Sequence, residues 1–294
     1  MTRRGLTVKR VIKLCVVKGA AMFNIHRLHR RPSFPHAAWL SPANRLTHIQ
    51  NLIRRREPDA PLRPRVLHVE LEPPRRKLPT NNQHAEAGIY SRKTETFQFA
   101  EAKGERHLLT ICEADPAVIS YTSQPHTLRF RGDCSFEAYT PDVLINKVDN
   151  VTEVVEVKYD YRDAVDDTRY LRKLLAASRY YDSIGWRFSI LTEADDLEGS
   201  ISLANARAID LCKNDQLDTA DLFRLSVLLG ESGGSSTLGA AEACLKRSEE
   251  EHPAFARRKV LAAISGRELG VDIHGRLLNP SSVVWSLGSK GTSR

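Results

Sequence analysis

The stretch FEAYTPDVLINKVDNVTEVVEVKY, residues 136–159, decides the fold of this chain. Its pattern predicts one strand from Phe136 to Ile145 and a second from Thr152 to Tyr159. The pair Asp149-Asn150 between them is typical of a turn, so we expect the two strands to lie side by side. Around them the chain predicts the order helix, several strands, helix, strand, which indicates a compact α/β layer.

Charged side chains of both strands are expected to meet on one face of the sheet. Glu156 and Lys158 are two residues apart and therefore point to the same side of their strand. A fold near the turn brings Asp142 roughly opposite Glu156, so that two carboxylates and an ammonium group converge. Carboxylates this close repel each other unless a cation lies between them. Hard ions such as Mg²⁺ or Mn²⁺ prefer oxygen ligands of this kind.

Lys158 fits the same chemistry. A lysine beside a metal ion can orient or deprotonate the attacking water, or stabilise the charge that builds on a phosphorane during in-line hydrolysis of a phosphodiester. The alternative is an exposed sheet face on which Asp142, Glu156 and Lys158 form a salt bridge. The motif is short and needs structural context. Its place on two adjacent strands, with a helix before and after, favours the nuclease interpretation.

A helix predicted at 101–113 supplies a further acid. Glu105 shares the apolar face of this helix with Leu108 and Cys112, and Glu101 lies one turn earlier. An unpaired carboxylate on an apolar face is costly. Such a glutamate either packs its stem at the edge of the surface or reaches over the sheet as an acid that faces the metal.

The rest of the chain divides into three parts. We expect a basic, Pro-rich and partly disordered arm at 1–85, with a short helix between Pro42 and Arg55, an α/β domain at 86–196 and a C-terminal domain at 197–294. Helices followed by a hairpin within 271–287 suggest a small winged-helix-like domain, and the Gly/Ser-rich run 231–236 is expected to be a flexible link. Other expected elements are strands at 118–121, 126–130 and 186–191, and helices at 166–183, 201–212, 219–229, 238–247 and 253–265.

Charge is unevenly spread along the chain. The 294 residues carry 44 Lys and Arg and 36 Asp and Glu, a net charge of +8, and 41% are apolar, as in ordinary soluble globular proteins. Residues 1–80 hold 18 Lys and Arg against four Asp and Glu, a net of +14, so the remainder carries −6. Such an arm is either a solvated tail or a contact for a polyanion, and both interpretations stay open.

Several classes of protein are excluded or disfavoured. No run of 18 apolar residues is present, so we expect no transmembrane helix. Lys13 and Lys18 interrupt the apolar run near the N-terminus, which argues against secretion, and Met22 is an alternative start. The absence of an HExxH motif and of a GxxxxGK[ST] loop argues against a zinc hydrolase and a P-loop ATPase. Widely spaced cysteines without a CxxC pair predict reduced thiols in a cytosolic protein: Cys15, Cys112, Cys134, Cys212 and Cys244.

Several motifs in order across about residues 86–195 resemble the TnsA endonuclease family, the restriction-enzyme-like subunit of heteromeric cut-and-paste transposases. A later segment, 260–284, is similar to the C-terminal helical domain of that family, more weakly. The motifs that carry the resemblance are Gly88-Ile89-Tyr90-Ser91-Arg92-Lys93, Glu101 with Glu105-Arg106, Asp115-Pro116-Ala117-Val118, Gln124-Pro125, Tyr139-Thr140-Pro141-Asp142 and Glu156-Val157-Lys158.

The resemblance implies a restriction-endonuclease-like PD-(D/E)xK core, a mixed sheet flanked by helices. It makes Glu105 the helix acid, Asp142 the central metal ligand, Glu156 the second strand ligand and Lys158 the catalytic lysine. The spacing to Asp115 favours Glu105 over Glu101. Some members of the family have glutamine where Glu156 stands.

The resemblance also implies an activity and partners. The activity is Mg²⁺-dependent cleavage of DNA, with Mn²⁺ as a substitute, at the 5′ ends of a transposable element. The partners are double-stranded DNA, a DDE-type TnsB-like transposase subunit and an AAA+ TnsC-like regulator bound through the C-terminal domain, all in the bacterial cytoplasm. Two alternatives stay open: a stand-alone restriction or repair nuclease, and a DNA-binding assembly protein with an inactive nuclease fold.

Overall fold

The computed structural model describes residues 41–56, 66–70, 87–131, 136–248 and 252–287. The chain divides into two units, residues 1–41 and 42–294. The expectations for residues 1–40 and for Cys134 lie outside the described residues. Among the helices that the structure describes, none is both long and apolar enough to cross a membrane.

A four-stranded mixed sheet forms the centre of the second unit. Its order is β4 (Val118–Ser123), β7 (Val143–Lys147), β8 (Thr152–Lys158) and β9 (Arg187–Thr192). The first three strands are antiparallel, and β9 runs parallel to β8. The predicted turn between β7 and β8 is confirmed as a short 3₁₀ segment, η2 (Val148–Asn150), in which the last two residues have positive φ angles of 65° and 57°.

The strand predicted from Phe136 to Ile145 is wrong as a single element. Residues 136–139 form β6 (Phe136–Tyr139), which pairs with β5 (Thr127–Arg131) in a separate sheet, and β7 begins only at Val143. Pro141 lies at the break and has no backbone N–H to donate to a neighbouring strand. The chain therefore changes sheets immediately before Asp142.

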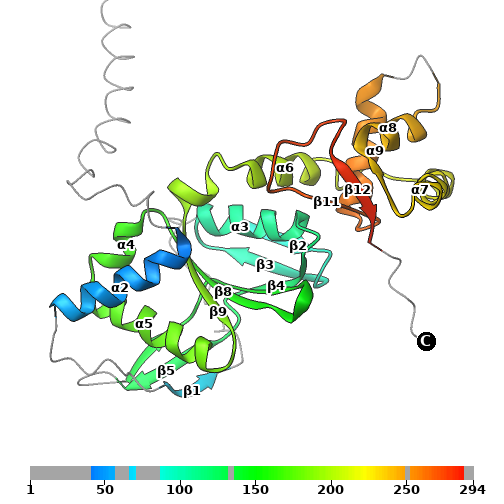
Figure 1. Ribbon diagram of the computed structural model, residues 1–294. Coiled ribbons are helices and arrows are strands. Elements are labelled where there is room, and N and C mark those ends of the chain that lie inside the picture. The colour runs from blue at the N-terminus through cyan, green and yellow to red at the C-terminus, as the bar shows by residue number, and fades with distance from the viewer. Residues whose placement is uncertain (1–40, 57–65, 71–86, 132–135, 249–251, 288–294) are drawn as a thin grey trace, which may run out of the picture. The chain divides into compact units, whose positions relative to one another are not determined.

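Helices cover both faces of the central sheet (Figure 1). The predicted helix at 101–113 is α3 (Lys103–Ala114), and its buried side chains pack with Val143, Ile145, Val155 and Val157 on one face. The predicted helix at 166–183 is α5 (Thr168–Ser183), which contacts β9. A short helix that was not predicted, α4 (Tyr161–Val165), joins β8 to α5 and carries a capping box.

Two described segments of the expected arm pack onto the same unit. The predicted short helix is confirmed as α2 (Pro42–Arg56), which contacts α5 and β9. Its Arg45 is 1% exposed, forms a 2.5 Å ion pair with Asp196 and donates to the carbonyl of Ile190 at 2.8 Å. Strand β1 (Val66–Glu70) pairs antiparallel with β5. A separate hairpin, β2 (Ala87–Ser91) and β3 (Thr96–Ala100), leads into α3.

The C-terminal part contains the four predicted helices and a small sheet. After a π-helical turn, η3 (Glu193–Leu197), come α6 (Ile201–Asp210), α7 (Thr219–Glu231), α8 (Leu238–Leu245) and α9 (Pro253–Ser265). Strand β12 (Val283–Ser286) lies between β10 (Ser235–Thr237) and β11 (Leu269–Val271). The expected flexible link at 231–236 is wrong at its end, because Ser235 and Ser236 pair with β12. The winged-helix assignment stays a prediction.

Candidate active site

Asp142 immediately precedes β7, one of the two inner strands of the central sheet. The registered pair Val143↔Val155 is the last before it, so Asp142 is one step further along and opposite Glu156. Its carboxylate accepts a 2.7 Å hydrogen bond from the backbone N–H of Val157, and its carbonyl accepts one of 2.8 Å from Gln124. These two contacts fix Asp142 against both of its neighbours in the sheet.

The surroundings of Asp142 are unfavourable for a negative charge. Burial, followed by the charges of Glu156 and Glu105, raises the pKa of Asp142 well above its ordinary value, and the opposing effect of Lys158 is smaller. The protein thus brings together three acids that repel one another. A bound cation would relieve this repulsion.

Glu156 is held by three donors on two different elements and its own strand. The residue is 2% exposed. Its Oε2 accepts a 2.6 Å hydrogen bond from the hydroxyl of Tyr139, and its Oε1 accepts from the hydroxyl of Tyr170 and from Lys158 Nζ, the latter at 2.6 Å. Buried carboxylates require such partners, because the cost of removing them from water is otherwise uncompensated.

Lys158 ends β8 next to these acids. Burial alone would lower the pKa of its ammonium group, but the charges of Glu156 and Asp142 outweigh that effect and raise it. The Nζ atom also lies 4.8 Å from the centre of the Tyr170 ring, in a cation–π arrangement. Lys158 is consequently a cation at neutral pH.

Glu105 reaches the same place from the first turn of α3. It is 7% exposed, and one carboxylate oxygen accepts a 2.8 Å hydrogen bond from the backbone N–H of Glu101. Its charge acts on both Asp142 and Lys158. Glu101, in contrast, is exposed and precedes the helix, and its carboxylate accepts from the side-chain amide of Gln124 at 3.1 Å. The four residues predicted from the sequence therefore face a common region, and the backbone N–H of Glu101 donates to one of them, Glu105.

The close approach of α3 to the sheet depends on Gly104. A Cβ atom at this position would lie 2.9 Å from Val157 Cγ1 and 3.1 Å from the Cβ of Glu193. Both distances are shorter than ordinary van der Waals contacts. Glycine thus allows the helix start, and Glu105 with it, to lie against β8.

The donor set fits a hard divalent ion in its chemistry. Glu105, Asp142 and Glu156 offer only oxygen atoms, and their mutual repulsion favours a cation between them. Within the described ranges, however, no group of three or more His, Cys, Asp or Glu side chains is already arranged so that it could hold a metal ion. Both oxygens of Glu156 accept hydrogen bonds in this arrangement.

Sequence reasoning did not identify Tyr139 and Tyr170 as site residues. Tyr170 lies half-buried on the predicted helix α5, and no pattern in the sequence indicated that its hydroxyl contacts Glu156. Tyr139 lies three residues before Asp142, on β6. The family resemblance includes Tyr139 in the motif Tyr139-Thr140-Pro141-Asp142 but gives it no role, and the split of the predicted strand was not visible from the pattern.

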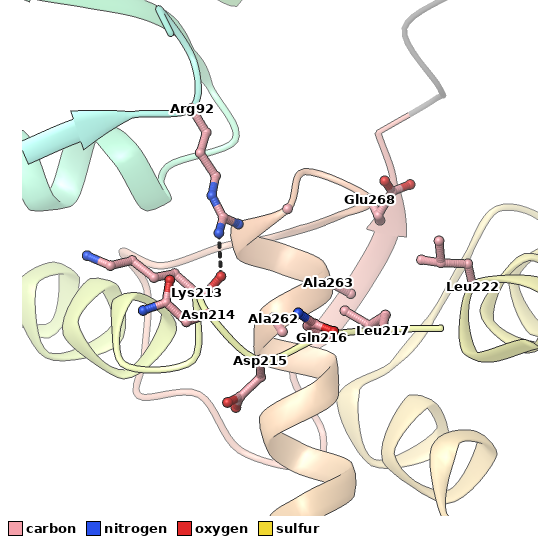
Figure 2. Close-up of a pocket in the computed structure, with 11 residues that line it drawn as sticks. Arg92, Lys213, Asn214, Asp215, Gln216, Leu217, Leu222, Ala262, Ala263 and Glu268 are labelled. Atoms are coloured by element: carbon pink, nitrogen blue, oxygen red, sulfur yellow. Dashed lines mark hydrogen bonds between the residues drawn. The ribbon is translucent and has the colours of Figure 1, made fainter. Parts of the chain in front are cut away.

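Figure 2 shows a pocket elsewhere in the unit, together with the residues that line it. Arg92, from the turn after β2, extends into it and donates to the carbonyl of Lys213. The lining residues come otherwise from the chain between α6 and α7, from α7, and from α9 and the turn after it. None of the four predicted site residues lines this pocket, so it is separate from the candidate active site.

Comparison with known proteins supports the interpretation of the sheet region. Residues 115–193 match the family model described as TnsA-like endonuclease N terminal. The match runs from the end of α3 through β9 and contains Asp142, Glu156 and Lys158, whereas Glu105 precedes it. No curated protein matches the chain. The resemblance to the TnsA family is confirmed for this segment, which is similar to the N-terminal endonuclease domain of that family.

Proposed function

We propose that the protein is a metal-dependent DNA endonuclease that acts as one subunit of a heteromeric cut-and-paste transposase. The observation that carries the proposal is the convergence of Glu105, Asp142, Glu156 and Lys158 at the edge of a TnsA-like endonuclease domain. Three mutually repelling acids beside one cation are costly to the fold, and such arrangements cluster at functional sites.

Each site residue has a distinct task in this proposal. Asp142 and Glu156, with Glu105 from α3, would hold Mg²⁺ or Mn²⁺. When bound, the ion supplies Lewis acidity toward a phosphoryl oxygen and lowers the pKa of water. Lys158 is protonated and fixed by Glu156, so it can donate hydrogen bonds to the scissile phosphate and stabilise the charge that develops there.

The strand that is cut and the partners follow from the family resemblance. We propose cleavage at the 5′ ends of the element, on the strand that is not joined to the target. A DDE-type transposase subunit would handle the 3′ ends, and an AAA+ regulator would bind the C-terminal part, residues 197–294. Confinement of activity to this assembly suits a nuclease with access to chromosomal DNA.

Nicking of end-labelled duplex DNA that carries an element end tests the proposal. The full chain, supplied with a DDE-type transposase subunit and Mg²⁺, is expected to nick the DNA. The Asp142→Ala variant should lose this activity while its circular dichroism spectrum remains native. The matched control is Asp182→Ala, which removes an exposed carboxylate from α5 and should cut like the wild type.

Three outcomes would change the proposal. Undiminished cutting by Asp142→Ala would remove the assignment of the site. Efficient cutting of plain duplex DNA by the chain alone would indicate a stand-alone nuclease. A chain that binds DNA but neither cuts it nor binds Mn²⁺ would indicate an assembly protein with an inactive fold.

A further inference from the structure

We propose that Tyr170 is a positioning residue that, together with Tyr139, fixes the carboxylate of Glu156 and keeps Lys158 beside it. The inference rests on the proposed nuclease function of the same site. It extends that function to two residues outside the PD…ExK motif.

The hydroxyls of the two tyrosines donate hydrogen bonds to different oxygens of the same carboxylate. Tyr139 donates to Oε2 of Glu156 at 2.6 Å, and Tyr170 donates to Oε1. A carboxylate bonded at both oxygens cannot rotate about its terminal torsion without breaking at least one of these bonds. The plane of the Glu156 carboxylate is therefore set by β6 and α5, and not by β8 alone.

Tyr170 also makes a second contact, with the lysine of the motif. Lys158 Nζ lies 4.8 Å from the centre of the Tyr170 ring and 2.6 Å from the same Oε1 that accepts the Tyr170 hydroxyl bond. The ring attracts the cation and the hydroxyl orients the anion. One side chain thus fixes both charged members of the ExK motif relative to each other.

The elements that carry the tyrosines are themselves tied together. Arg169, which precedes Tyr170, donates through Nε to Glu137 on β6 at 2.8 Å, and Glu137 is two residues before Tyr139. The start of α5 is defined by Asp167, whose side chain caps the helix at the backbone N–H of Arg169. Both hydroxyls consequently approach Glu156 from a connected framework.

A merely structural role makes a different prediction. If the hydroxyls only satisfy a buried acid, their loss should lower the unfolding temperature and leave the folded fraction fully active. If they position Glu156 and Lys158, their loss should impair metal binding and turnover in protein that is still folded. Partners of metal-binding carboxylates typically change metal affinity or activity by about 10–100-fold when they are removed.

The test uses the full chain and the variants Tyr170→Phe and Tyr139→Phe, which remove a hydroxyl and keep the ring. We expect each to lower kcat for nicking by about 10-fold or more, with KM for the DNA unchanged, and to weaken Mn²⁺ binding by calorimetry. Tyr170→Leu also removes the ring under Lys158, so its kcat should be lower than that of Tyr170→Phe. The matched control is Tyr180→Phe on the same helix, whose ring packs against Tyr181.

The outcomes separate this inference from the function on which it rests. The positioning role alone is overturned if the wild-type chain binds Mn²⁺ and nicks DNA, but Tyr170→Phe and Tyr139→Phe behave like Tyr180→Phe. A wild-type chain that neither binds Mn²⁺ nor nicks overturns the nuclease function and this inference with it. An equal loss of kcat in Tyr170→Phe and Tyr180→Phe would show a general effect on α5 and would also contradict the proposal.

Discussion

At the scale of single residues, the buried carboxylate of Asp142 lowers the stability of the fold. The ordinary pKa of an aspartate is 3.8, and burial with the charges of Glu156 and Glu105 raises the pKa of Asp142 well above it. A group that binds its proton more tightly in the folded than in the unfolded state makes stability fall as the pH rises. The penalty is absent below about pH 3.8 and complete above the raised pKa of Asp142.

Asp142→Asn should therefore stabilise the metal-free protein while it abolishes nicking. Asparagine can still accept the bond from the Val157 N–H, but it carries no charge. At neutral pH we expect a gain of about 1 kcal/mol, or about 2–4 °C in Tm, and the gain should shrink as the pH falls toward the ordinary aspartate value. Thermal unfolding in a metal chelator at several pH values measures it.

The control for this measurement is Asp182→Asn on the exposed side of α5, for which no change in Tm is expected. A Tm of Asp142→Asn below that of the wild type at neutral pH would show that the carboxylate contributes stability to the fold. The assignment of Asp142 as an acid whose charge destabilises the fold would then be incorrect.

The candidate residues could be predicted because they depend on local rules. Side chains of a strand alternate between faces, and a turn at Asp149 sets the register, so Asp142 and Glu156 follow from spacing alone. The hydroxyl contacts of Tyr139 and Tyr170 could not be predicted in this way. They depend on how β6 and α5 pack, and the apolar pattern of α5 does not show which carboxylate a hydroxyl on that helix will meet.

At the scale of elements, the approach of α3 to β8 is the arrangement that brings Glu105 to the site. Gly104→Ala would introduce a methyl group 2.9 Å from Val157 Cγ1. We expect it to destabilise the protein by about 1–3 kcal/mol, since overpacking forces the neighbours to move. Urea-induced unfolding measures the change.

The matched variant is Gly230→Ala in α7, where a Cβ atom would meet nothing within 4 Å. Alanine is the better helix former, so this variant should gain about 0.5–1 kcal/mol. Equal effects of the two substitutions would contradict the close contact between α3 and β8.

The predicted boundaries of the elements were wrong where a strand pairs with a segment far away in the sequence. The run at 231–236 has the composition of a linker, and Gly233 and Gly234 do adopt positive φ angles of 70° and 93°. Ser235 nevertheless pairs with Trp285, 50 residues later in the chain. No local feature of the sequence predicts a pairing strand at that distance, whereas the helices on either side have clear caps and apolar faces.

At the scale of the whole molecule, side chains of the described C-terminal part contact helix α3 and the residue that follows it. Arg207 on α6 makes a 2.8 Å hydrogen bond with His107 on α3, and His274 forms a 3.0 Å ion pair with Asp115 at the end of α3. Both contacts reach the helix that carries Glu105. A partner that binds the C-terminal part would thus act close to a helix of the site.

The central claim is that acids distant in the sequence form one site for a divalent ion. Calorimetric titration of Mn²⁺ into the full chain tests it most directly, with Asp142→Asn and Glu156→Gln compared against Asp182→Asn. The account predicts binding by the wild type and by Asp182→Asn that is lost in both site variants. Equal binding by all four proteins, or binding by none, would contradict it.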